Sequence, residues 1–144
     1  MQKFEFVEDE KYFSKLLCEK GEDVSKYYSL FDFRNPSLKR REFNKIRNSI
    51  FNNLLKLKGS VCGLSFDKIC DINSGFNVDH IIPLSTNKLN KELRNMNPLK
   101  GKKVRTQSFG SNELSNLILT CRKCNAYKKN KILTKQEIKE ILKK

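Results

Sequence analysis

The stretch NVDHIIPL, residues 77–84, contains the only histidine of this 144-residue chain. His80 directly follows Asp79, and the apolar run around the pair predicts a short β-strand that ends near Pro83. Neighbouring side chains on a strand point to opposite faces. A twist or bulge at the strand end is therefore expected if Asp79 and His80 serve one site. Taken alone, such a pair is more often structural than functional, so the surrounding sequence decides.

Helical patterns precede this strand. Apolar spacing predicts two short helices between Glu8 and Phe33, broken near Gly21. A longer amphipathic helix is expected from Pro36, with Asn35 as its N-cap and Gly59 at its end. Its basic residues are expected on the face opposite the apolar one, namely Lys39, Arg40, Arg41, Lys45 and Arg47.

The second half of the chain mixes strand and helix signals. Residues 60–84 contain short β-prone pieces that predict a hairpin, and residues 85–113 combine a short helix with a lysine-rich loop. A last strand, NLILT, precedes a helical segment, and Thr134 and Glu137 form a capping-box pattern at the C-terminal helix. The fold class expected is α+β, with a helical region 1–58 and a core 59–144 in one compact unit.

Charge is distributed unevenly along the chain. The net charge is +14, from 30 Lys and Arg against 16 Asp and Glu. Residues 1–35 carry six basic against eight acidic residues, residues 36–84 eight against four, and residues 85–144 sixteen against four. An excess of this size is typical of proteins that bind polyanions. The last 60 residues are expected to face such a partner, although general lysine enrichment is the alternative.

No stretch approaches the ~20 apolar residues that a membrane-spanning helix needs, and the N-terminus lacks the apolar segment of a signal peptide. We therefore expect a cytoplasmic protein of bacterial or phage origin without a membrane partner. Five cysteines are then expected to be reduced thiols. Cys18 is expected in the core, whereas four lie on either side of His80: Cys62, Cys70, Cys121 and Cys124.

Several fixed spacings occur together in this half of the chain. VDHIIPL at 78–84 is followed by NLILTCRKCNAYK at 116–128. Over about residues 60–133, this arrangement resembles the HNH endonucleases, some of which are restriction enzymes. The resemblance implies a ββα-metal core, which is a β-hairpin, a metal ion and a crossing helix.

The resemblance also implies roles for single residues in metal-dependent hydrolysis of DNA phosphodiester bonds. His80 would be the general base, because a neutral imidazole accepts a proton near neutral pH. Asn116 would orient its ring by accepting a hydrogen bond from the other ring nitrogen. Asp79 and Asn125 would hold Mg²⁺ or Mn²⁺, since hard cations prefer oxygen ligands.

Cys121 and Cys124 have the spacing of half a structural zinc site. Zinc-bearing relatives often carry a second such pair before the hairpin, but here Ser65 stands where its second cysteine is expected. Either Cys70 joins Cys62 and supplies the fourth thiolate, or both are small buried apolar residues and no zinc binds. We favour the zinc site.

Double-stranded DNA is the expected partner. The compact chain favours a site-specific, restriction-type enzyme, whose recognition sequence does not follow from the residues. A phage or intron-associated nicking or homing enzyme, a less specific defence or repair nuclease, and a non-catalytic zinc-containing nucleic-acid-binding module are the alternatives. The candidate DNA contacts are Lys128, Lys129, Lys102, Lys103, Arg105 and Arg41.

One histidine implies one candidate site, so a double-strand break requires a second copy. A homodimer is the simplest solution. The net acidic N-terminal region would suit its interface, unless its aromatic residues pack within one subunit: Phe13, Tyr27, Tyr28, Phe31 and Phe33.

Overall fold

The structure is a computed structural model that describes residues 4–84, 87–94, 107–129 and 131–143. Its architecture is α+β, as predicted. The elements, with η for a 3-10 helix, are α1 (Val7–Leu17), η1 (Val24–Leu30), α2 (Pro36–Lys58), η2 (Ile72–Ser74), β1 (Phe76–His80), α3 (Asn87–Arg94), η3 (Leu114–Asn116), β2 (Leu117–Cys121), α4 (Arg122–Lys128) and α5 (Lys135–Lys143).

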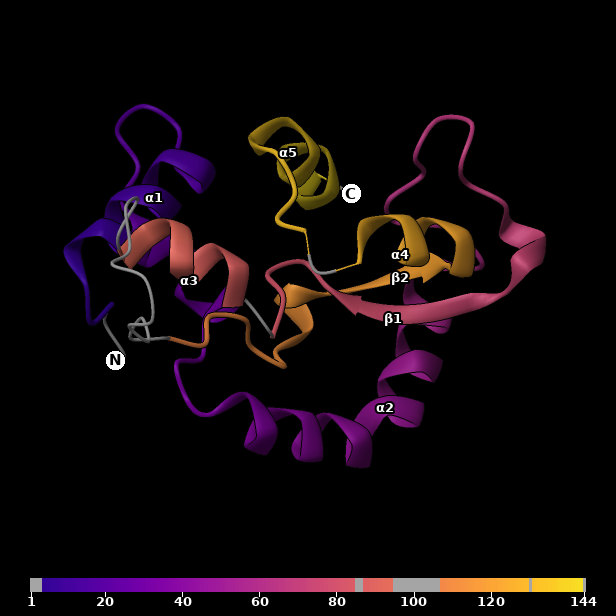
Figure 1. Ribbon diagram of the computed structural model, residues 1–144. Helices are drawn as coiled ribbons and strands as arrows, with labels where there is room; N and C mark the ends of the chain where they lie inside the picture. The colour runs from indigo at the N-terminus through magenta and orange to yellow at the C-terminus, as the bar shows by residue number, and fades with distance from the viewer. Residues whose placement is uncertain (1–3, 85–86, 95–106, 130, 144) are drawn as a thin grey trace.

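The centre of the fold is the antiparallel pair β1 and β2. Phe76 pairs with Cys121, and the register continues without interruption to His80 opposite Leu117. A bulge, one of the two alternatives expected at the strand end, is therefore absent from β1. In Figure 1, α2 runs along one side of this pair and α4 lies on the other, and both helices contact both strands. The two faces of the pair are thus covered by different helices.

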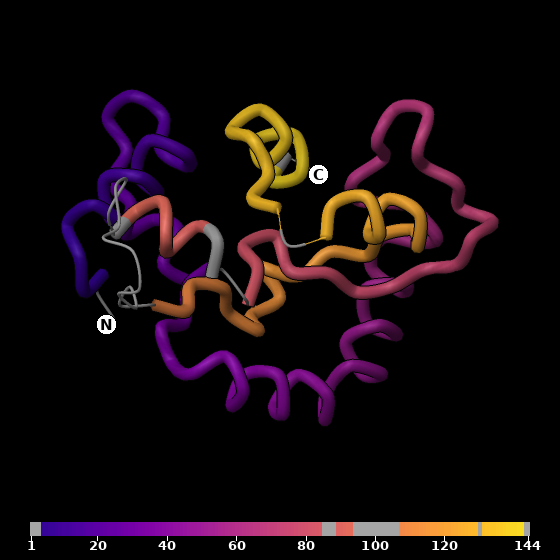
Figure 2. The backbone as a smooth tube through the Cα atoms, in the orientation of Figure 1, coloured from indigo at the N-terminus to yellow at the C-terminus, as the bar shows by residue number. Residues whose placement is uncertain are grey.

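The prediction of a hairpin within residues 60–84 is wrong, because only one strand of the pair lies in this range. Residues 60–71 form a loop with bends and one turn at residues 67–69, and the strand that pairs with β1 comes from beyond α3. Figure 2 shows the chain looping outward between the end of α2 and the start of β1. Gly63 N donates to Leu119 O at 2.7 Å, which fastens this loop to β2. The loop was expected to supply a strand of the sheet. It instead makes a backbone hydrogen bond to β2 from outside the strand pair.

The helix predictions are confirmed in most respects. Asn35 accepts a hydrogen bond from Ser37 N and caps α2, while Gly59 ends it at a φ of 73°. Thr134 and Glu137 exchange the reciprocal hydrogen bonds of a capping box before α5. The break near Gly21 is also present, because α1 ends at Leu17 and the following helix η1 is of the 3-10 type.

One apolar core joins both halves of the chain. It contains Phe13 and Phe31 from the N-terminal region together with Ile81, Phe109 and Ile138. The Phe13 ring lies 4.9 Å from both the Phe31 and the Phe109 rings. Phe13 and Phe31 thus pack within one subunit, which is the alternative stated for the aromatic residues of the N-terminal region.

The loop before η3 passes very close to the end of β1. A Cβ at Gly110 would lie 1.9 Å from Ile82 O, so only glycine fits there. Gly110 N also donates to Pro83 O at 3.2 Å. This contact brings the following residues, including Asn112, beside His80. None of the described helices combines the length and apolar character that crossing a bilayer requires.

Candidate functional site

Asp79 and His80 contact opposite sides of the strand pair. The His80 ring packs on Phe43 of α2, with ring centroids 4.7 Å apart. The Asp79 carboxylate instead faces Lys128 of α4, where Oδ2 lies 2.9 Å from Nζ. The regular register of β1 explains this separation, since neighbours on a strand alternate between faces.

Among the described residues, the His80 ring has one polar partner. Nε2 lies 2.8 Å from Oδ1 of Asn112. Burial lowers the pKa of His80 below its ordinary value, while the Asn112 contact and the charge of Asp79 oppose that shift. The lowered pKa favours a neutral imidazole at neutral pH, which is the form that can accept a proton.

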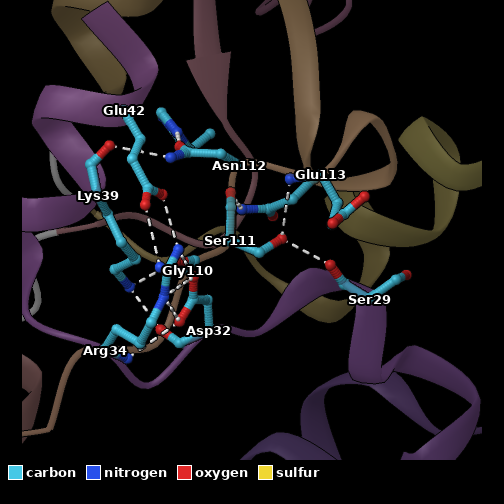
Figure 3. Close-up of polar contacts among 11 residues, drawn as sticks. Ser29, Asp32, Arg34, Lys39, Glu42, Gly110, Ser111, Asn112 and Glu113 are labelled. Atoms are coloured by element: carbon cyan, nitrogen blue, oxygen red, sulfur yellow. Dashed lines mark hydrogen bonds and ion pairs between the residues drawn. The ribbon is translucent and has the colours of Figure 1, made fainter.

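Asn112 is itself held by the first turns of α2. Its Nδ2 donates to Lys39 O at 2.9 Å, as the dashed line in Figure 3 shows. The Lys39 side chain is fully buried, and its Nζ donates to Asp32 O and Gly110 O, both at 2.5 Å. Lys39 was expected on the exposed basic face of α2, so that prediction is wrong. Its ammonium instead satisfies two backbone carbonyls.

Asn116 does not contact the His80 ring, and its predicted orienting role is wrong. Its Oδ1 accepts from Ile82 N at 2.8 Å, and its Nδ2 donates to Ile82 O and Ser111 O. The residue is fully buried. The Asn116 side chain therefore links the segment just after β1 to the residue just before β2.

Lys128 was expected on the DNA-contacting surface, but it is 2% exposed. Its Nζ donates to His80 O at 2.9 Å in addition to its contact with Asp79. The prediction of a phosphate contact is therefore wrong for Lys128. The last residue of α4 instead supplies a positive charge to the carboxylate expected to hold a metal ion.

The two predicted oxygen ligands of that ion lie on β1 and α4. Neither Asp79 Oδ1 nor the Asn125 side chain makes a hydrogen bond within the described part of the chain, and Asn125 is half-buried. Asn125 lies one turn before Lys128 on α4, and α4 packs on β1. Both side chains therefore keep oxygen atoms that a cation can use.

The four cysteines around the strand pair come together. The Sγ atoms of Cys62, Cys70, Cys121 and Cys124 all lie within 4.8 Å of one another. Tetrahedral zinc with Zn–S bonds of ~2.3 Å requires Sγ atoms about 3.8 Å apart. Cys121 and Cys70 have this spacing, at 3.8 Å. The cluster can hold a metal ion such as zinc, which confirms that Cys70 is its fourth member.

Ser65 stands where a second Cys-x-x-Cys pair would have its last cysteine, and its contacts are to Cys62. Its N–H donates to Cys62 Sγ at 3.3 Å, as the corresponding residue of a Cys-x-x-Cys turn would, at a φ of 48°. Its hydroxyl donates to Cys62 O at 2.6 Å and so does not point a ligand at the cluster. The chain then continues to Cys70, which completes the set.

Backbone N–H groups also point at these sulfurs. Cys121 Sγ accepts from Cys124 N at 3.3 Å and from Asp71 N at 3.5 Å. Burial raises the pKa of Cys121, but these donors outweigh it and lower the pKa to about 6. Burial raises the pKa values of Cys70 and Cys124. The backbone donors therefore favour the thiolate of Cys121, which is the form that binds a metal ion.

Of the other predicted DNA contacts, two are exposed in the structure and three lie outside the described residues. Arg41 and Lys129 are exposed, as a phosphate contact requires. Lys102, Lys103 and Arg105 lie outside the described residues. Arg47 stacks over the Phe43 ring, with Cζ 5.4 Å from its centroid, and is also exposed. The exposed basic face of α2 thus extends next to the helix residue that packs on His80.

The sequence did not predict the side chains that contact Asp79 and His80. Phe43 and Asn112 contact the His80 ring, and the buried Lys128 contacts Asp79. Phe43 and Lys128 carried ordinary apolar and basic signals, and nothing in the sequence set Asn112 apart from other asparagines. The chain matches no family model, no curated protein and no solved structure. The resemblance to HNH endonucleases therefore rests on the residues themselves.

Proposed function

We propose that this protein is a divalent-metal-dependent DNA endonuclease of the HNH type. The observation that carries the proposal is the meeting of three elements. The pair Asp79–His80 ends β1, β2 runs beside it into the cysteine cluster, and α4 returns Asn125 and Lys128 to β1. Two strands and a helix that packs across them are the protein parts of a ββα-metal arrangement, and Asp79 on β1 and Asn125 on α4 would hold its catalytic ion.

His80 is the general base of the proposed reaction. Hydrolysis of a phosphodiester requires that water lose a proton as its oxygen attacks phosphorus, and that the leaving oxygen be stabilised. The low pKa of the half-buried ring keeps it ready to accept that proton. Phe43 and Asn112 fix the ring on two sides, which supports a base in a constant position.

Asp79 and Asn125 are the proposed ligands of Mg²⁺ or Mn²⁺. Asp79 Oδ1 and the Asn125 side chain make no hydrogen bond to the described residues, and β1 and α4 pack together, which supports this role. Such an ion supplies charge stabilisation at the phosphate. Lys128 pairs with Oδ2 of Asp79, which leaves Oδ1 as the oxygen that would bind the ion. The ion would then share this carboxylate with the lysine.

Zinc is the proposed ion of the cysteine cluster. The cluster of four thiols supports a structural zinc site, because the distance between the sulfurs of Cys70 and Cys121 suits tetrahedral coordination. Cys121 and Cys124 lie on the turn that starts α4. This ion would fix the start of α4, which carries Asn125 and Lys128. Zinc and the catalytic cation would therefore be separate ions with separate roles.

The proposed substrate is double-stranded DNA, which the net charge of +14 and the exposed Arg41 and Lys129 support. A restriction-type enzyme is the role we favour. A non-catalytic zinc-containing DNA-binding module is a second candidate, because Asp79 and His80 face opposite sides of the strands and Lys128 pairs with Asp79.

Plasmid cleavage with and without Mg²⁺, followed by sequencing of the ends, separates these functions. Discrete ends at one short motif would indicate a restriction enzyme, whereas nicked circles without linear product would indicate a nicking enzyme. Scattered ends would indicate a general nuclease. Binding of DNA without any cleavage, in zinc-loaded protein with Mg²⁺ or Mn²⁺ present, would refute the nuclease proposal in favour of the binding module.

A further inference from the structure

The amide of Asn112 has a defined orientation. One end of the amide faces Lys39 O at 2.9 Å, and the other faces Nε2 of His80 at 2.8 Å. A backbone carbonyl has no hydrogen to donate, so the NH₂ end must face Lys39. The oxygen end then faces the ring, and an amide oxygen only accepts. The hydrogen of this contact must therefore belong to Nε2 of His80.

We infer that Asn112 is a positioning residue that holds His80 in the tautomer protonated at Nε2, which leaves Nδ1 as the nitrogen that accepts a proton. This inference rests on the proposed function for its catalytic meaning. In the neutral ring, one nitrogen carries hydrogen and the other carries the lone pair. The partner of the first nitrogen thus selects the second as the base. Within the described residues, Nδ1 makes no hydrogen bond.

The support behind Asn112 is firm enough for this task. The Lys39 carbonyl belongs to α2, and the Lys39 side chain fastens that part of the helix to Asp32 O and Gly110 O. Ser111 fastens the same loop from the other side, since its hydroxyl donates to Ser29 O at 2.6 Å. Figure 3 shows these contacts converging on the loop that carries Asn112. A loose loop would let the amide rotate, and this one is held at both ends.

The steps of the proposed hydrolysis follow with their protons accounted for. Nδ1 takes a proton from water as the water oxygen bonds to phosphorus, and the ring becomes a cation with hydrogen on both nitrogens. The Asn112 oxygen still accepts from Nε2 in that cation, so the contact survives the transfer. The proton then leaves with the displaced oxygen or returns to solvent. No rotation of the ring is needed at any point.

The single histidine permits a direct test by ¹⁵N NMR of the full-length, zinc-loaded protein. Every imidazole nitrogen signal belongs to His80. At mildly alkaline pH, the wild-type ring should show a proton bonded to Nε2, in slow exchange with water, and an unprotonated Nδ1. In Asn112→Ala that proton signal should be lost to exchange. Cleavage should fall about tenfold, the typical net worth of one neutral hydrogen bond.

Ser111→Ala is the matched control. It removes the hydroxyl contact with Ser29. The backbone hydrogen bond from Ser111 N to Leu30 O and both contacts of the Asn112 amide stay in place. Its ring signals should match the wild type. A wild-type proton on Nδ1, or an Asn112→Ala spectrum unchanged from wild type, overturns the inference whether or not the protein cleaves DNA. Absence of cleavage with the expected wild-type spectrum instead counts against the nuclease proposal and leaves the tautomer assignment standing.

Discussion

Nζ of Lys128 lies 2.9 Å from Oδ2 of Asp79 and 2.9 Å from the backbone oxygen of His80. The lysine side chain is 1% exposed and the aspartate side chain 16%. A lysine at the end of α4 thus neutralises one member of the pair on β1 and binds the backbone of the other. Because the carboxylate is already paired with this ammonium, binding of the proposed metal ion at Asp79 would alter the ion pair.

Lys128→Met should destabilise the fold by about 3 kcal/mol, because it leaves a mostly buried carboxylate without its partner. Mg²⁺ should then raise the melting temperature of this variant more than that of the wild type, since the ion replaces the lost charge. Thermal denaturation with and without Mg²⁺ measures both effects. Lys129→Met, at the exposed neighbouring position, should change stability by less than about 0.5 kcal/mol. Equal losses in the two variants would contradict the buried ion pair.

Cys121→Ser should remove zinc and unfold the domain globally, because metal binding at a thiolate site is coupled to folding. Cys70→Ser should have the same effect, since the structure makes Cys70 part of the cluster. Elemental analysis should find about one zinc per wild-type chain. Cys18→Ser, outside the cluster, should keep its zinc. Folded, carefully purified wild-type protein without zinc would rule out the proposed ion.

Lys39 predicts a pH dependence of stability. Burial lowers its pKa from 10.5 to about 8, so between these values the unfolded chain binds more protons than the folded one. Wild-type stability should therefore rise with pH relative to Lys39→Met, by up to about 1.4 kcal/mol per pH unit in that window. Urea denaturation at several pH values measures the difference. Lys45→Met, at an exposed position on the same helix, is the control for the loss of one positive charge.

His80→Ala should reduce Mg²⁺-dependent cleavage by at least about 100-fold while DNA binding changes little, because a general base acts mainly in the transition state. Initial rates on supercoiled plasmid and a binding titration on the same DNA separate the two quantities. A variant that keeps most of its cleavage rate would exclude His80 as the base. The products should carry 5′-phosphate and 3′-hydroxyl ends, which religation by a ligase checks.

Asn116→Ala should act on stability instead. It removes three hydrogen bonds to the backbone at Ile82 and Ser111 from a fully buried position, which should cost about 2–3 kcal/mol. At a temperature where the variant is still folded, it should retain much of the cleavage activity. Chemical denaturation and cleavage assays on one preparation compare these effects. A stable but inactive variant would return Asn116 to a catalytic role.

Local chemistry made the helices predictable from the sequence. Asn35, Pro36 and Gly59 mark the ends of α2 by conformational preferences that hold in any context. The spacing of Cys121 and Cys124 is likewise local, and it predicted that both belong to one metal-binding cluster. These signals need no knowledge of the tertiary fold.

The neighbours of His80 could not be predicted in this way. Asn112 reaches the ring because the loop at Gly110 passes against Ile82, which is a long-range contact. Lys128 looked like a surface cation, since lysine is rarely buried without a partner, and its partners lie 48 residues away or more along the chain. Residues 60–71 looked β-prone, but their hydrogen bonds go to turns, to β2 and to cysteine sulfurs.

The connection between β1 and β2 also bears on how the chain folds. The strands cannot pair until a long stretch between them has closed, and contacts so distant in sequence slow folding. Cys70 and Cys121 are 51 residues apart and span the same stretch. An ion that bridges them early would hold the two segments close together before the strands align. Metal supply would then govern how fast this protein folds as well as how stable it becomes.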